Sequence, residues 1–247
     1  WGDSSGNGND FQSSTLVSSF PPAKPTNPLR YSYGGGALDK TIINCDKCTT
    51  MFESVANSPL QAEFTIFEVS QRVSPTPVTP NEGSLISYNN TTAALLPLIS
   101  IGNKSNVAPF GVPPLYDNQL KVRITDTALN SMIFDYADMP TADTSINHIT
   151  MVRLEGTTAM VDYLAAGNII SVTKTNPLYV PQTYTGKKLL LGNRGNILTN
   201  DCAAAGGLGN NFGWTGNLQE IIVFNRALNS SEQDKIKDYL NKKYRIY

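Results

Sequence analysis

Residues that carry acid–base and metal chemistry are scarce in this sequence, which has one histidine and three cysteines among 247 residues. Any histidine-based catalytic scheme must therefore run through His148. The pattern Gly-x-Ser-x-Gly occurs once, at Gly2–Gly6 in the opening loop, but no helix is predicted after it to form the elbow that would activate the serine as a nucleophile. No apolar run approaches the roughly 18 residues that a membrane span requires. These features argue against a serine hydrolase and against insertion into a membrane.

Charge of either sign is also sparse, because only 16% of the residues are charged and the formal net charge is -1. Affinity for phosphate backbones comes largely from clustered Lys and Arg, and no basic stripe is visible here. We therefore expect no nucleic-acid partner. With 40% hydrophobic residues the chain can bury a full core, and we expect a single domain over residues 1–247.

The cysteines do not form a recognisable framework. Cys45-Asp46-Lys47-Cys48 has the spacing of a redox motif or of half a zinc site, but no second pair exists to complete it. The residues that follow give no sign of the helix that a redox motif normally opens. We expect Cys45, Cys48 and Cys202 to be structural, either as free thiols or with one local bridge.

Short runs with period-two alternation predict a β protein. In Gln119–Thr125, for example, Leu120, Val122 and Ile124 alternate with polar residues. Comparable runs, bounded by turn clusters, predict strands over Glu63–Val69, Gln119–Thr125, His148–Leu154, Ala159–Leu164, Ile169–Val172 and Lys188–Leu191. Segments rich in Pro, Gly, Asn and Ser separate these runs and predict long surface loops, at Phe20–Pro28, Ser74–Gly83, Ala108–Pro114 and Asn200–Gly213.

The end of the chain combines a strand and a helix. Leu218, Glu220, Ile222 and Phe224 are expected on one face of the strand, with the intervening residues on the other. Asn229 followed by Glu232 predicts a capped helix start, so Asn229 is better explained as a cap than as a glycosylation site. A helix over 230–244 would present Ile236, Tyr239, Leu240 and Tyr244 on one apolar face, which we expect to dock on the edge or rim of the sheet.

Most of the chain resembles the concanavalin A-like, laminin-G-like jelly-roll superfamily. The resemblance is carried, in the expected order, by Trp1–Asp10, Phe64–Val69, the hairpin Asn147–Val152 with Met160–Tyr163, and Leu189–Asn193 leading into Trp214–Tyr244. It implies an all-β, two-sheet antiparallel jelly-roll sandwich with one short C-terminal α-helix. Such domains usually have one more strand before the opening tryptophan, so we expect that strand to have been removed or to come from another chain.

The same resemblance implies a structural use for His148, since laminin-G-like domains often have a histidine of the scaffold at this position. Enzymes on this fold cut polysaccharides with carboxylates that are closely spaced on one strand. No such cluster occurs here, because Glu63 and Glu68 fall on opposite faces and Glu220 stands alone in its strand. We therefore expect a protein that is not an enzyme.

Two neighbouring loops combine aromatic and planar hydrogen-bonding side chains, which is typical of sugar binding. The ligand-binding candidates are Asn193, Arg194, Asn196, Asn211, Phe212 and Trp214. The alternative is that Trp214 plugs the core and that the Asn-Gly pairs are turn chemistry. Acceptor triplets for N-glycosylation occur at Asn89, Asn90 and Asn103 and are compatible with an exterior protein.

The opening loop places oxygen-bearing side chains at alternate positions around a glycine, as in a calcium-binding loop. The candidate ligands are Asp3, Ser5, Asn7, Asn9 and Asp10. Only two of them are charged, and Ser14 stands where a calcium loop has glutamate. The loop is therefore either a weak calcium site or a glycine-rich turn held by side-chain hydrogen bonds. No other cofactor is expected.

The combined interpretation is a lectin-like surface module that makes adhesive or recognition contacts, with a glycan as the favoured ligand. The alternatives are a structural component of a virion capsid, fibre or other extracellular assembly, whose partners are other subunits, and an accessory binding domain of a larger carbohydrate-active enzyme. A glycan or a protein surface is the expected partner, and the expected location is extracellular or on a virion or other particle.

The calcium loop makes a first testable prediction. If residues 3–10 bind calcium, then calcium in excess of its dissociation constant raises the melting temperature, because it binds the folded chain only. Asp3→Asn should remove this increase. The measurement is thermal unfolding with calcium and with a chelator, and an identical melting temperature in both would show that the loop is a turn without a metal.

Overall fold

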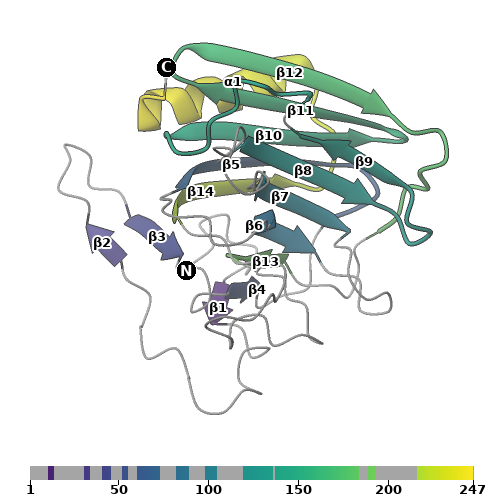
Figure 1. Cartoon of the computed structure of the whole chain (residues 1–247), viewed down its shortest axis with the longest axis horizontal. Coiled ribbons are helices and arrows are strands. Elements are labelled where there is room, and N and C mark those ends of the chain that lie inside the picture. The colour runs from purple at the N-terminus through teal and green to yellow at the C-terminus, as the bar shows by residue number, and fades with distance from the viewer. Residues whose placement is uncertain are drawn as a thin grey trace, which may run out of the picture.

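The computed structural model describes residues 11–13, 31–33, 41–45, 52–54, 60–72, 82–88, 98–104, 119–135, 137–183, 189–192 and 216–246. Strands dominate these residues, and α1 (Ser230–Tyr244) is the one helix among them (Figure 1). The strands are β1 (Phe11–Ser13), β2 (Tyr31–Tyr33), β3 (Thr41–Cys45), β4 (Phe52–Ser54), β5 (Phe64–Arg72), β6 (Glu82–Tyr88), β7 (Ile99–Lys104), β8 (Gln119–Thr125), β9 (Ser131–Phe134), β10 (His148–Glu155), β11 (Thr158–Ala165), β12 (Asn168–Thr175), β13 (Leu189–Leu191) and β14 (Gly216–Phe224).

The strands form two antiparallel sheets, as predicted. The first sheet has the order β1-β4-β13-β6-β7-β8-β9, and the second has the order β12-β11-β10-β5-β14-β3-β2. The β10–β11 hairpin runs in unbroken register from Ile149 opposite Leu164 to Glu155 opposite Thr158. The all-β sandwich with a C-terminal helix is therefore confirmed.

The main core lies between the two sheets. Side chains of β5, β10 and β11 meet those of β7, β8 and β9 there, and Phe64, Ile66, Val122, Phe134 and Val152 are all fully buried. Alternation places the remaining residues of each strand on the outer face of its sheet. The outer residues of the second sheet are apolar as well, so its central strands are buried on both faces.

The helix covers this second apolar surface. Leu240 is fully buried in a cluster with Phe67, Val69, Ile149 and Met151, which point outward from the second sheet. The expectation of docking at the edge or rim of a sheet is therefore wrong. Both faces of β5 and β10 carry large apolar side chains, and only a helix lying across the sheet removes the outer ones from water.

Local sequence determines where the helix begins. Asn229 accepts a hydrogen bond from the backbone N–H of Glu232 at 3.0 Å, and the Glu232 carboxylate accepts one from the backbone N–H of Asn229 at 3.0 Å. This reciprocal capping box was predicted, and it satisfies amides that the first helical turn leaves unpaired. No helix in the described part of the chain is long and apolar enough to cross a membrane.

Two details of the closing segment differ from the alternation and spacing read in the sequence. The pairing of β14 with β5 shifts between Leu218 and Glu220, so one extra residue is inserted into β14. Leu218 consequently points into the main core, whereas Ile222 and Phe224 face the helix. In the helix, Tyr239 is 44% exposed rather than docked, and its hydroxyl donates to the Glu220 carboxylate at 3.2 Å.

Asp126 organises the loops at one end of the sandwich. Its carboxylate accepts hydrogen bonds from the backbone N–H of Asn130 at 2.8 Å and from that of Val180 at 3.0 Å. Between these contacts, Leu129 has a φ of 69° and is 51% exposed. A leucine in the left-handed region is strained, and little burial compensates for the strain here.

Leu129→Asn should therefore stabilise the protein by about 1 kcal/mol, because asparagine tolerates this backbone conformation better. Leu178→Asn is a matched control, since Leu178 is 69% exposed and has an ordinary φ. Urea unfolding of both variants and the parent measures the difference. Equal or lower stability of Leu129→Asn relative to Leu178→Asn would contradict the strain argument.

Candidate functional site

The structure leaves several sequence-predicted site residues undescribed. The ligand-binding candidates Asn193, Arg194, Asn196, Asn211, Phe212 and Trp214, the calcium candidates Asp3, Ser5, Asn7, Asn9 and Asp10, and the glycosylation candidates Asn89 and Asn90 lie outside the described residues. The remaining glycosylation candidate, Asn103, lies in β7 opposite Gly83 of β6 and Leu120 of β8. Cys45 is the last residue of β3, and Cys48 and Cys202 lie outside the described residues.

His148 is buried between the sheets, with only 2% of its surface exposed. Its Nδ1 donates to the carbonyl oxygen of Ile146 at 3.0 Å, and its Nε2 lies 3.3 Å from both the Glu68 carboxylate and the Ser70 hydroxyl. The ring also packs against Tyr163, with 5.1 Å between centroids. This burial suits a role of His148 in the scaffold.

Glu68 and His148 form a buried pair of ionisable groups. Burial by itself would lower the pKa of His148, but the attraction of the Glu68 carboxylate and the hydrogen bond to it outweigh burial and raise that pKa above 6.5. A raised folded-state pKa means that the stabilisation is complete below the unfolded pKa and is lost as pH rises through the folded pKa. One Glu68 oxygen, Oε2, makes no hydrogen bond, and neither does the hydroxyl of its cross-strand neighbour Thr150.

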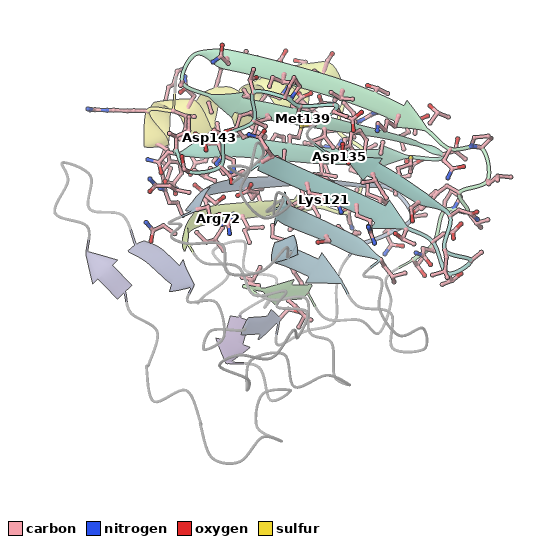
Figure 2. The ribbon with its side chains drawn as sticks, viewed as in Figure 1. Arg72, Lys121, Asp135, Met139 and Asp143 are labelled. Atoms are coloured by element: carbon pink, nitrogen blue, oxygen red, sulfur yellow. The ribbon has the colours of Figure 1, made fainter. Side chains whose placement is uncertain are left out.

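The segment from Asp135 to Asn147 connects the sheets beside this pair. Met139 and Ala142 anchor it in the main core, and the Tyr163 hydroxyl donates to the carbonyl oxygen of Asp143 at 2.5 Å. Asp143 also pairs with Gln119 at the start of β8, which brings an exposed carboxylate next to the first sheet. In Figure 2, Asp135, Met139 and Asp143 mark the course of this segment, and Lys121 marks β8.

The outer faces of the two sheets differ in chemistry. The helix covers the apolar outer face of the second sheet. On the first sheet, Leu120, Val122 and Ile124 of β8 point into the core, so the alternating polar residues of this strand point outward. We call the outward-pointing residues of β7, β8 and β9 the polar face, which consists of Ser100, Gly102, Gln119, Lys121, Arg123, Thr125, Ser131 and Ile133.

Two cations lie at the centre of the polar face next to small residues. Lys121 pairs with Gly102 of β7, and Arg123 pairs with Ser100. Lys121 is 8% exposed, and the side-chain oxygen Oε1 of Gln119 is buried without a hydrogen bond. Gly102 and Ser100 are small, so no large side chain of β7 lies directly opposite the two cations. Gln119, Lys121 and Arg123 thus form a polar group on the side of β8 that points away from the core.

Several of the described carboxylates form ion pairs with neighbouring lysines. Asp138 pairs with Lys174 at 2.7 Å, and Asp162, which is 5% exposed, pairs with Lys237 of the helix at 2.5 Å. No group of three or more His, Cys, Asp or Glu side chains that could hold a metal ion occurs among the residues that the structure describes. The sequence contains the alternation that turns Lys121 and Arg123 away from the core, but the sequence-based prediction placed the binding site on aromatic loops and did not include these two residues.

Comparison with known proteins supports the fold. No protein-family model matches the chain, and no curated protein matches its sequence significantly. Among solved structures, the chain is similar to the binding domain of Paraclostridial Mosquitocidal Protein 1, with a TM-score of 0.54 and 15% identity over 97% of this chain and 49% of that one. It is also similar to tailspike protein 2 of Escherichia coli O157:H7 bacteriophage CAB120, with a TM-score of 0.53 and 8% identity over 82% of this chain and 25% of that one.

A third similar structure is NanB with optactamide, with a TM-score of 0.51 and 13% identity over 78% of this chain and 27% of that one. Another structure describes NanB as a sialidase from Streptococcus pneumoniae. The chain thus spans less than half the length of each of these three proteins. Identities this low show a shared fold alone.

The buried pair makes a testable prediction, because His148 is the only histidine and gives a single imidazole signal in NMR. In Glu68→Gln the pKa of His148 should fall below 6.5, since burial then acts without the attraction of the carboxylate. Glu63→Gln is the matched control, because Glu63 is exposed and lies outside this pair. The same imidazole pKa in the parent and in Glu68→Gln would contradict the assignment.

Proposed function

We propose that this chain is a non-enzymatic, lectin-like surface module of concanavalin A-like type that binds a glycan on its polar face. The observation that carries the proposal is the contrast between the two outer faces. The helix occupies the apolar one, and the other carries the polar residues Gln119, Lys121 and Arg123, of which Lys121 is largely buried. Charged and amide groups on rigid strands match the hydroxyl and carboxyl groups of a sugar.

The charges on this face favour a glycan that carries a carboxylate. Arg123 can form two parallel hydrogen bonds with a carboxylate, and Lys121 can add a further charged contact. The neighbouring Asp143 offers an acceptor for sugar hydroxyls. The similarity to a toxin binding domain over 97% of the chain, and to a structure of NanB, agrees with a recognition role outside the cell.

A second candidate function is a structural component of a virion or other assembly, and the similarity to a phage tailspike favours it. The chain spans only 25% of that tailspike, so in this case it would be one part of a longer subunit. A further candidate function is an accessory binding domain of a larger carbohydrate-active enzyme. The similarity to NanB, of which the chain spans 27%, favours this candidate in the same way. In each of these cases the chain itself binds and does not catalyse.

A glycan array with the intact chain tests the leading proposal, with Lys121→Met and Arg123→Met as variants. Each should weaken binding to acidic glycans roughly tenfold to a hundredfold, because a hydrogen bond to a charged group is lost. Lys235→Met is the matched control, since Lys235 is exposed on the helix, away from the polar face. Circular dichroism checks that each variant is folded.

The outcomes separate the alternatives. Loss of binding in Trp214→Ala, with unchanged binding in Lys121→Met and Arg123→Met, would assign the ligand to the sequence-predicted loops and exclude the polar face. No binding of the parent chain to any acidic or neutral glycan would overturn the lectin function and leave the assembly role.

A further inference from the structure

The two sheets end differently on the side where β9 and β12 lie. β12 is the edge strand of the second sheet and has eight residues without proline or a register shift. Its residues alternate between exposed and half-buried, with Ile170 and Val172 packed against the main core. In Figure 1, β12 borders the sheet next to β11, with no labelled strand beyond it.

The turn before β12 determines which backbone groups face the open edge. Ala166 and Gly167 have φ values of 47° and 79°, so they form a two-residue turn that closes on the pair Ala165 and Asn168. That closing pair is hydrogen-bonded in such hairpins, and hydrogen-bonded pairs alternate along an antiparallel ladder. The N–H and C=O groups that face away from β11 therefore belong to Ile169, Ser171, Thr173 and Thr175.

The corresponding edge of the first sheet is closed. Lys174 donates to the carbonyl oxygen of Ile133 on β9 at 2.7 Å, and the Asn176 side chain donates to that of Ser131 at 3.2 Å. Side chains from the end of β12 thus cap carbonyl groups of β9. The outward groups of β12 have no such caps in the described part of the chain, and an uncapped edge is a template for another strand.

The charge of this edge suits an identical partner. Lys174 is the only charged residue of β12, and it points inward to Asp138 at 2.7 Å. The exposed row includes Ile169, Thr173 and Thr175, which favour strands, and Ile169 is 62% exposed. Two copies can approach along this edge without repulsion between like charges.

We propose that β12 pairs with β12 of a second copy of this chain, in antiparallel orientation, and joins the two second sheets into one. Only the odd-numbered residues of β12 point their backbone N–H and C=O groups toward the open edge. Each odd-numbered residue must therefore lie opposite an odd-numbered residue of the second copy. The pairing that uses them all places Ile169 opposite Thr175 of the second copy and Ser171 opposite Thr173. Val172 then lies on the two-fold axis, opposite itself. This inference does not rest on glycan binding.

The self-opposed position provides a direct test of the pairing. Cα atoms are about 4.5 Å apart in a non-hydrogen-bonded pair of an antiparallel ladder, within the range that a disulfide spans. Val172→Cys should therefore form a covalent dimer under mild oxidation, whereas Ile170→Cys, whose position lies opposite Lys174 of the second copy, should not. The parent chain contains only the native cysteines, so it measures how much covalent dimer forms without an introduced cysteine. Linkage through Ile170→Cys and not through Val172→Cys would overturn this register.

Sedimentation equilibrium of the intact chain tests the association itself. The parent should form dimers with increasing concentration, and Thr173→Lys should raise the dimer dissociation constant at least tenfold, because it places two like charges beside the axis. Thr141→Lys adds the same charge on an exposed loop and should leave the constant unchanged. A monomer at all concentrations, or equal dimerisation of Thr173→Lys and the parent, would overturn the proposal.

Discussion

The second sheet has apolar side chains on both faces, and much of the molecule follows from this constraint. Ile66 and Val152 point into the space between the sheets, whereas Phe67 and Met151 point the other way. Two hydrophobic faces require two covers. The first sheet covers one and the helix covers the other, with Asp162 and Lys237 paired beneath the helix. The helix thereby removes one outer face from consideration as a binding site.

The buried pair of Glu68 and His148 is the polar exception within this layered core. Glu68 is 1% exposed and His148 is 2% exposed, so either group alone would be poorly solvated. Their proximity compensates for part of that penalty, and the hydrogen bond to Ile146 orients the imidazole ring. The pair therefore holds the start of β10 to β5 and makes the stability of the sandwich sensitive to pH.

Sequence patterns predicted the sheets better than the surfaces. The shared core-facing side of Leu120, Val122 and Ile124 in β8 and the capping residues Asn229 and Glu232 depend on local rules, and both appear in the structure as expected. The face of Leu218 was missed because a bulge changes the parity of β14, and a single sequence does not reveal a bulge. The polar face was missed because the sequence shows Lys121 only as one polar residue of an alternating strand and does not reveal that Gly102 lies beside it.

Pairing at the β12 edge would determine how the polar faces of the two copies are oriented relative to each other. Residues directly opposite each other in an antiparallel pair project from the same side of the sheet. Pairing of β12 with its copy would therefore keep both helices on one side of the joined sheet and both polar faces on the other. If each polar face binds a glycan as proposed, the two sites face the same way and can engage one surface together, and the second binding event is then intramolecular. A module with modest affinity for each glycan would in this way adhere firmly to a surface that displays many copies.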